Sequence, residues 1–201
     1  MGKKIGIMGG TFNPIHNGHL LLAESAREVF GLDEVIFMPS GNSYMKDASI
    51  ILDGVTRAHM VSLAVSGNPL FSLSKAEIER KGPTYTCETL RQFRQKNMDN
   101  QYFFMMGADN LFILEKWKDV EYVLSNCVIV VAVRGSETEE KVRETAKLLA
   151  ERYRADIRIL PARRIDISSF EIRQRLKEGR SVRYMLPDSV FAYIDENSLY
   201  R

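Results

Sequence analysis

Cysteine and histidine are scarce in this sequence, which has 2 cysteines and 3 histidines among 201 residues. Cys87 and Cys127 lie far apart, and neither belongs to a CxxC pair. This pattern gives no support for a disulfide framework. No secretory signal peptide is recognised at the N-terminus, so we expect the reducing environment of the cytoplasm.

The sequence also lacks a long apolar run and a large excess of one charge. No apolar run approaches about 20 residues, so we expect no membrane span. The 28 basic and 26 acidic residues leave a formal net charge of only +2. That balance gives no argument for nucleic acid or an anionic membrane as a main partner. Hydrophobic residues make up 45% of the chain, as in an ordinary globular protein.

Short apolar segments alternate with segments of helical period along the whole chain. The apolar segments, rich in β-branched and aromatic residues, are 3–8, 34–39, 69–74, 101–106, 127–133 and 157–160. The expected helices are 19–30, 53–66, 86–96, 136–153, 168–178 and 188–200. Near-continuous apolar strands are typical of a parallel sheet buried on both faces. We therefore predict an α/β fold with a doubly wound, mostly parallel sheet and helices on both faces.

The length fits one domain, for which we predict bounds of 1–201. Residues 163–201 are expected to form a C-terminal helical part of that domain. Two capping boxes predict where helices start: Ser136 with Glu139, and Ser168 with Glu171. Thr86 is the expected N-cap of the helix at 86–96.

Ligands of doubly wound folds bind beyond the carboxyl ends of the strands. The turn Gly9-Gly10-Thr11 follows the first strand. Glycine lets a backbone approach a ligand closely and adopt unusual dihedral angles. The turn matches neither GxxxxGK[ST] nor GxGxxG, which argues against a Walker-type NTPase and a dinucleotide fingerprint.

Two of the three histidines, His16 and His19, lie three residues apart where the next helix begins. They share one face of its first turn, where helix N–H groups favour an anion. A shared metal ion would need further ligands, and His59 and the cysteines are scattered. A nucleophile for a general base is not evident, because the sequence has no GxSxG elbow. Structural capping of the helix and catalysis both remain open from the spacing alone.

The stretch GGTFNPIHNGH resembles the phosphate-binding motif of the HxGH nucleotidyltransferases. A second stretch about 150 residues further on, Ile167-Ser-Ser-Phe-Glu-Ile-Arg173, resembles their ISSxxIR element. Nearly the whole chain is similar to the bacterial nicotinate mononucleotide adenylyltransferases within that superfamily. The similarity also covers residues 39–46, 82–90, 107–117 and 167–187.

The resemblance implies a site for ATP. His16, His19 and Arg173 would be the catalytic residues, acting on the ATP phosphates. The implied ATP-binding residues are Gly9, Gly10, Thr11, Phe12, Gly18, Gly107, Asp109, Arg134, Ile167, Ser168 and Ser169. Phe170 stands where many relatives have a hydroxyl residue, which leaves Ser168 and Ser169 as the better phosphate ligands. A plain N-cap with a surface arginine is the alternative for this element.

The resemblance also implies a mononucleotide site made by Lys46, Thr84, Tyr85, Thr86 and Trp117. Relatives often have Pro-Pro-His just before the lysine, and here that segment is Ser43-Tyr44-Met45. A solvated lysine, a simple turn and cap, and an ordinary half-buried tryptophan are the structural alternatives.

The activity implied is adenylyl transfer from ATP to nicotinate mononucleotide, a step of NAD biosynthesis. Mg²⁺ is expected to come with ATP, with few or no protein ligands and no separate metal site. ATP and the mononucleotide are the expected partners, and the sequence leaves a homo-oligomer open. The alternatives are another phosphate acceptor, nicotinamide mononucleotide or phosphopantetheine, and a nucleotide sensor without turnover.

Overall fold

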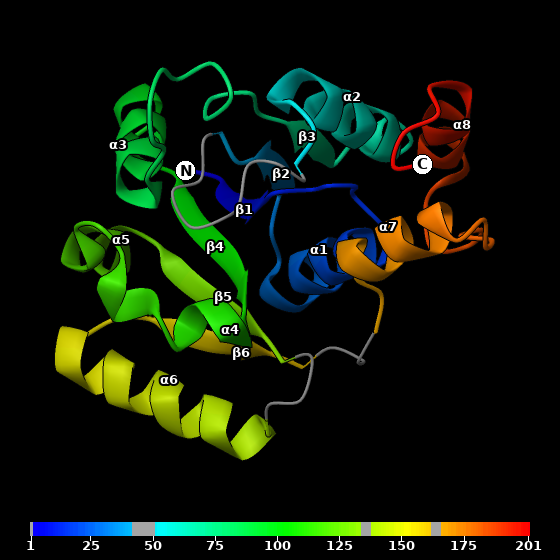
Figure 1. Ribbon diagram of the computed structural model, residues 1–201. Coiled ribbons are helices and arrows are strands. Elements are labelled where there is room, and N and C mark those ends of the chain that lie inside the picture. The colour runs from blue at the N-terminus through cyan, green and yellow to red at the C-terminus, as the bar shows by residue number, and fades with distance from the viewer. Residues whose placement is uncertain (1, 42–50, 134–137, 162–165) are drawn as a thin grey trace.

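A computed structural model describes residues 2–41, 51–133, 138–161 and 166–201. Lys46 and Arg134 lie outside the described residues. Six parallel strands form one sheet in the order β3-β2-β1-β4-β5-β6, which confirms the predicted fold class (Figure 1). The strands are β1 (Lys4–Gly10), β2 (Glu34–Pro39), β3 (Phe71–Leu73), β4 (Gln101–Gly107), β5 (Val128–Ala132) and β6 (Ile157–Leu160).

Apolar side chains leave the central strands on both faces of the sheet. In β4, Phe103 and Met105 enter one core, and Phe104 and Met106 enter the core on the opposite face. This alternation follows from the two-residue period of a strand. It explains why the strands appear in the sequence as continuous apolar runs.

Each face is covered by a separate group of helices (Figure 1). The first group is α1 (Asn17–Phe30), α2 (Gly54–Val65), α7 (Ser169–Lys177) and α8 (Asp188–Glu196). The second is α3 (Thr86–Lys96), α4 (Ala108–Leu111), η2 (Leu114–Lys116), α5 (Val120–Asn126) and α6 (Glu139–Tyr153). The C-terminal helices α7 and α8 thus share one hydrophobic core with α1 and α2, while the bounds of a single domain stay a prediction.

The direction of winding reverses between β1 and β4. The chain moves from β1 through α1 and α2 to β3, then returns to pair β4 with the other side of β1. The carboxyl ends of β1 and β4 are therefore adjacent, at Gly10 and Gly107. This reversal is the place where doubly wound sheets bind ligands.

Three local predictions were wrong. Helix α6 begins at Glu139 and has Thr138 as its N-cap, with the Thr138 side chain accepting from the Lys141 N–H, whereas the predicted N-cap, residue 136, lies outside the described residues. Helix α3 has Tyr85 at the N-cap, because the extended backbone of Tyr85 makes Thr86 the first helical residue. The last helix ends at Glu196, short of the predicted end at residue 200.

The short helices α4, η2 and α5 had not been predicted. None of the described helices combines the length and the apolar composition that crossing a bilayer requires.

Candidate functional site

Gly9 and Gly10 end β1 and provide space for aromatic rings. A Cβ atom on Gly10 would lie 3.1 Å from the ring of Phe12, and one on Gly9 would lie 3.2 Å from the ring of Phe104. The left-handed backbone expected of a glycine here belongs instead to Phe12, with φ of 49°. The Phe12 side chain is buried against Phe37, so only its backbone is available to line a nucleotide site.

His16 and His19 form a stacked pair at the start of α1. His16 occupies the N-cap position with extended backbone, and its N–H donates to Nδ1 of His19 at 3.2 Å. The two rings lie 3.6 Å apart, and Phe12 meets the His19 ring edge to face. Because Nδ1 of His19 accepts, the neutral ring carries its proton on Nε2. Packing thus fixes both the orientation of His19 and the ring nitrogen that can donate to a phosphate.

The start of α7 lies directly against the loop that precedes α1. Ser169 Oγ donates to the carbonyl oxygen of Pro14 at 2.8 Å, and Arg173 Nη1 donates to that of Asn13 at 2.7 Å. The two motifs that the sequence placed about 150 residues apart are therefore in contact. The predicted cap is also present, because Ser168 Oγ accepts from the Glu171 N–H at 3.1 Å.

Phe170, which stands where many relatives have a hydroxyl residue, is exposed at the start of α7. Its side chain is 68% exposed and lies beside Arg173, whose guanidinium carbon is 6.0 Å from the ring centre. Ile167, just before the helix, is half-buried against the core and anchors this end of α7.

Asn13 connects the loop to two further parts of the chain, and sequence reasoning missed it. Its side-chain oxygen accepts from the hydroxyl of Tyr200 at 2.8 Å and from the N–H of Leu52 at 3.3 Å. Asn13 is only 3% exposed. Burial raises the pKa of the Tyr200 hydroxyl, which keeps it a neutral donor. Neither residue had a distinguishing signal, since each looks like an ordinary loop or terminal residue.

Arg57 is a buried arginine that holds three loop ends together. Its guanidinium donates to the carbonyl oxygens of Thr11 at 2.7 Å, Ser40 at 2.7 Å and Leu52 at 2.9 Å. Burial lowers the pKa of this side chain. The signal in the sequence was its spacing from Met60 and Val61, which puts a charge on the apolar face of α2.

The remaining predicted ATP residues that the structure describes lie at the same edge of the sheet. Thr11 follows β1, and Gly18 lies in the first turn of α1. Gly107 is the N-cap of α4, and Asp109 is exposed in the first turn of that helix. Arg134 lies outside the described residues, so its predicted role has no structural counterpart here.

The predicted mononucleotide residues lie at the start of α3 and after η2. Thr84 is 8% exposed, and Tyr85 and Thr86 are half-buried at the helix start. Trp117 is also half-buried and meets Phe104 edge to face, with ring centres 5.8 Å apart. Phe104 also faces Gly9, so one aromatic side chain lies next to both halves of the predicted site. Lys46 lies outside the described residues.

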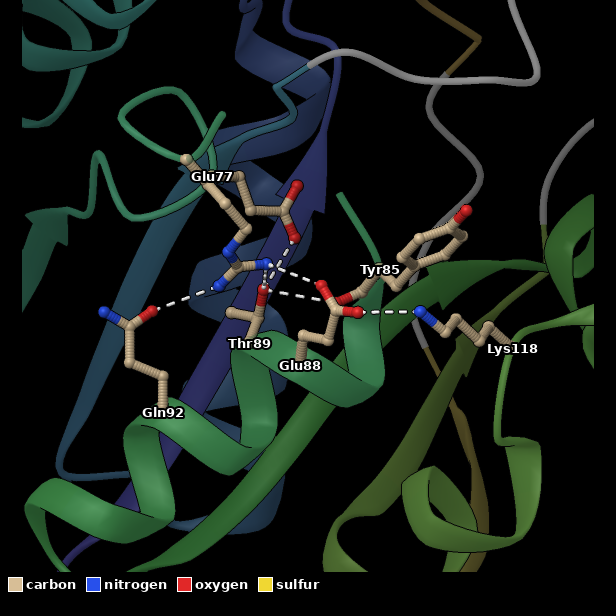
Figure 2. Close-up of polar contacts among 7 residues, drawn as sticks. Glu77, Tyr85, Glu88, Thr89, Gln92 and Lys118 are labelled. Carbon is tan, nitrogen blue, oxygen red and sulfur yellow. Dashed lines mark hydrogen bonds and ion pairs between the residues drawn. The ribbon is translucent and has the colours of Figure 1, made fainter. Parts of the chain in front are cut away.

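A polar cluster beside the Thr84–Thr86 segment was not predicted (Figure 2). Glu77 is 7% exposed, and Thr89 Oγ1 donates to its carboxyl at 3.1 Å. Arg80 donates to Thr89 Oγ1 and to Gln92 Oε1, each at 3.1 Å. Burial raises the pKa of Glu77.

The cluster continues to Lys118, beside Trp117 in the sequence. Lys118 Nζ lies 2.8 Å from a carboxylate oxygen of Glu88 and 4.2 Å from the ring centre of Tyr85. The hydrogen bond from Lys118 lowers the pKa of Glu88.

His59 is remote from the histidine pair, exposed on α2 and packed on the ring of Tyr193. Within the described residues, no three His, Cys, Asp or Glu side chains are grouped so that they could hold a metal ion.

The model of the cytidylyltransferase-like family matches residues 7–175. A protein of Lachnoclostridium phytofermentans named "Probable nicotinate-nucleotide adenylyltransferase" is 43% identical over 198 residues, covering 98% of this chain and 99% of the relative. A protein of the same name from Clostridium botulinum strain Eklund 17B is 41% identical over 199 residues, covering 99% and 98%.

Solved structures of Plasmodium falciparum nicotinic acid mononucleotide adenylyltransferase have a similar fold. The complex with NaAD superimposes with a TM-score of 0.79 at 17% identity, over 98% of this chain and 97% of that one. The complex with APC gives a TM-score of 0.76 over the same shares. From the family model and the full-length relatives, the chain belongs to the cytidylyltransferase-like family and, within it, to the nicotinate-nucleotide adenylyltransferases.

Proposed function

We propose that this protein transfers the adenylyl group of ATP to the 5′-phosphate of nicotinate mononucleotide, giving nicotinate adenine dinucleotide and pyrophosphate. The observation that carries the proposal is the contact between the two phosphate-binding motifs. Ser169 and Arg173 donate to the carbonyls of Pro14 and Asn13, directly beside the His16–His19 pair. The names of the full-length relatives support the same reaction.

An oxygen of the mononucleotide phosphate attacks the α-phosphorus of ATP in line. The new P–O bond forms as the bond from the α-phosphorus to the bridging oxygen breaks, and that oxygen leaves with pyrophosphate. The attacking phosphate is already an anion, so no general base is needed. Catalysis then depends on positioning two polyanions and stabilising the charge on the transferring group.

The chain offers donors for that charge from two directions. The Nε2–H of His19 and the first N–H groups of α1 would meet the ATP phosphates from one side. Ser168, Ser169 and Arg173 would meet them from the other side, with charge-assisted hydrogen bonds from the guanidinium. His16 lies under the His19 ring and fixes its orientation through the backbone hydrogen bond to Nδ1.

We assign the binding of nicotinate mononucleotide to Thr84, Tyr85, Thr86 and Trp117, and we assign the contact with its phosphate to Lys46. The first N–H groups of α3 are suited to a carboxylate, because a helix start favours an anion. We propose Mg²⁺–ATP as the donor substrate, with the metal carried by phosphate oxygens and water. Reaction in the cytoplasm agrees with the low cysteine content.

Pyrophosphate release tests the proposal. Purified protein with Mg²⁺–ATP is given nicotinate mononucleotide, nicotinamide mononucleotide, phosphopantetheine or no acceptor. We expect fast release with nicotinate mononucleotide alone. Equal release with the nicotinamide form would overturn the assignment of the acid-selective pocket. Absence of acceptor-dependent release would refute the transferase and favour a nucleotide sensor.

A further inference from the structure

The carboxyl group of Glu77 accepts a hydrogen bond from Thr89 Oγ1 in α3 at 3.1 Å. The Thr84 hydroxyl and the Gly41 N–H oppose the larger effect of burial on its pKa. A buried carboxyl group is costly unless such donors surround it. Glu77 therefore fixes the end of the segment after β2 against the start of α3, and Figure 2 shows the contacts on the α3 side.

Steric packing at Gly41 is independent evidence that the segment after β2 is held against Glu77 and Thr84. A Cβ atom on Gly41 would lie 2.3 Å from the backbone carbonyl oxygen of Glu77 and 2.8 Å from Cγ2 of Thr84. A backbone oxygen cannot rotate away as a flexible side chain can. The backbone of Gly41 is thus seated directly on both residues, which requires the absence of a side chain there.

The residue before Gly41 is bonded to the turn of the nucleotide site. Ser40 N–H donates to the carbonyl of Gly10 at 2.8 Å. Arg57 bridges the carbonyls of Thr11 and Ser40, at 2.7 Å each. A short chain of contacts therefore runs from Gly10 and Thr11, through Ser40 and Gly41, to Glu77.

The hydroxyl proton of Thr89 is directed toward Glu77 by its other neighbours. Arg80 donates to Thr89 Oγ1 at 3.1 Å, so this oxygen acts as an acceptor there. The proton can then point to Glu77 at 3.1 Å or to the Tyr85 carbonyl at 3.4 Å. The shorter distance favours Glu77.

We propose that Glu77 is a positioning residue, which sets the Thr84–Thr86 segment at the correct separation from the Gly9–Thr11 turn. This inference rests on the proposed function, in which the first segment binds the mononucleotide and the second binds ATP. Glu77 touches neither substrate. Its role is to align the attacking phosphate with the α-phosphorus, and misplacement by about 1 Å can cost about 100-fold in rate.

The test is Glu77→Gln, which keeps the shape of the side chain but turns one acceptor oxygen into an NH₂ group. That group cannot accept the hydrogen bond that Thr89 Oγ1 donates to the carboxyl group. We expect kcat/KM for nicotinate mononucleotide to fall by about 10- to 100-fold. The dissociation constant of Mg²⁺–ATP, measured by calorimetry, should stay within about twofold of the wild type.

Glu79→Gln is the matched control. Glu79 is exposed two residues further on and has no place in the proposed site, so its kinetic constants should equal those of the wild type. The positioning role is wrong if kcat/KM of Glu77→Gln for the mononucleotide equals that of the wild type. It is also wrong if the variant binds ATP as much more weakly as it uses the mononucleotide.

A second pair of variants keeps the test decisive if Glu77→Gln folds poorly. Thr89→Val removes the donor hydroxyl without changing the shape, and Thr89→Ser restores it. We expect the valine variant to lose kcat/KM for the mononucleotide and the serine variant to recover it. Equal values for both would overturn the inference. Failure of the proposed function is distinguishable, because the wild type itself would then show no acceptor-dependent pyrophosphate release.

Discussion

Arg173 Nη1 donates a 2.7 Å hydrogen bond to the carbonyl oxygen of Asn13, a residue 160 positions earlier in the chain. The bond holds the start of α7 against the loop before α1. Because this bond holds the side chain in place, the other guanidinium nitrogens of Arg173 have a fixed orientation, as a phosphate ligand requires.

Replacing Arg173 by alanine removes both the tether and the proposed phosphate ligand. We expect turnover to fall by about 100-fold, comparable with the loss of one preorganised donor. Steady-state pyrophosphate release measures this loss. Lys177→Ala, an exposed change on the same helix, should keep normal turnover, and equal loss in both variants would contradict a specific role.

His19→Ala should lower turnover by about 100-fold or more, because it removes the Nε2 donor to the ATP phosphates. The comparison is made at saturating substrates, after circular dichroism has established that the variant is folded. His59→Ala serves as the control, since His59 is exposed on α2. Turnover near that of the wild type would remove His19 from the mechanism.

Arg57→Met should destabilise the fold by about 3 kcal/mol or more. The change leaves the carbonyls of Thr11, Ser40 and Leu52 without the guanidinium, and each charge-assisted bond contributes about 1.5–3 kcal/mol. Urea unfolding gives the difference in free energy. Arg143→Met, on the exposed face of α6, should change it by about 0.5 kcal/mol or less. A similar small change for Arg57→Met would contradict the prediction.

The pH dependence of stability should report the buried carboxyl of Glu77. Its pKa is raised above the ordinary value of 4.5, mainly by burial. The folded state therefore holds the proton more tightly, and the associated stability is complete below pH 4.5 and lost as pH rises through the folded pKa. The side chain of the Glu77→Gln variant does not titrate, so the variant lacks this contribution to the pH dependence.

We therefore expect the free energy of unfolding of the wild type, relative to Glu77→Gln, to decrease as pH rises above 4.5. Urea titrations of both proteins across this range measure it, and effects common to both proteins cancel in the difference. A relative stability that is constant or increases with pH would show that the pKa of Glu77 is not raised.

The sequence predicted the six strands from their short apolar runs, and the helices α1, α2, α3, α6, α7 and α8 from their helical period. It missed α4, η2 and α5, which are too short to show one. It also placed the cap of α6 at residue 136 instead of Thr138, because both lie within one run of capping residues.

The two phosphate motifs were found from their residues, but the groups that support them were not. Asn13, Arg57, Glu77 and Tyr200 act through contacts between segments distant in sequence. Such contacts depend on how loops pack at the edge of the sheet, and no local pattern encodes them. Only the charge of Arg57 on an apolar helix face gave a signal.

The bond between Tyr200 and Asn13 has a consequence for synthesis of the protein. Tyr200 lies 187 positions after its partner. At about 5 to 20 residues per second, the ribosome needs about 10 to 40 s between these two residues. The nascent chain can pair its first strands during that time, but the bond to the Asn13 side chain forms only once Tyr200 has been synthesised. A polypeptide that stops before Tyr200 would therefore carry the histidine pair next to an Asn13 that lacks this hydrogen bond.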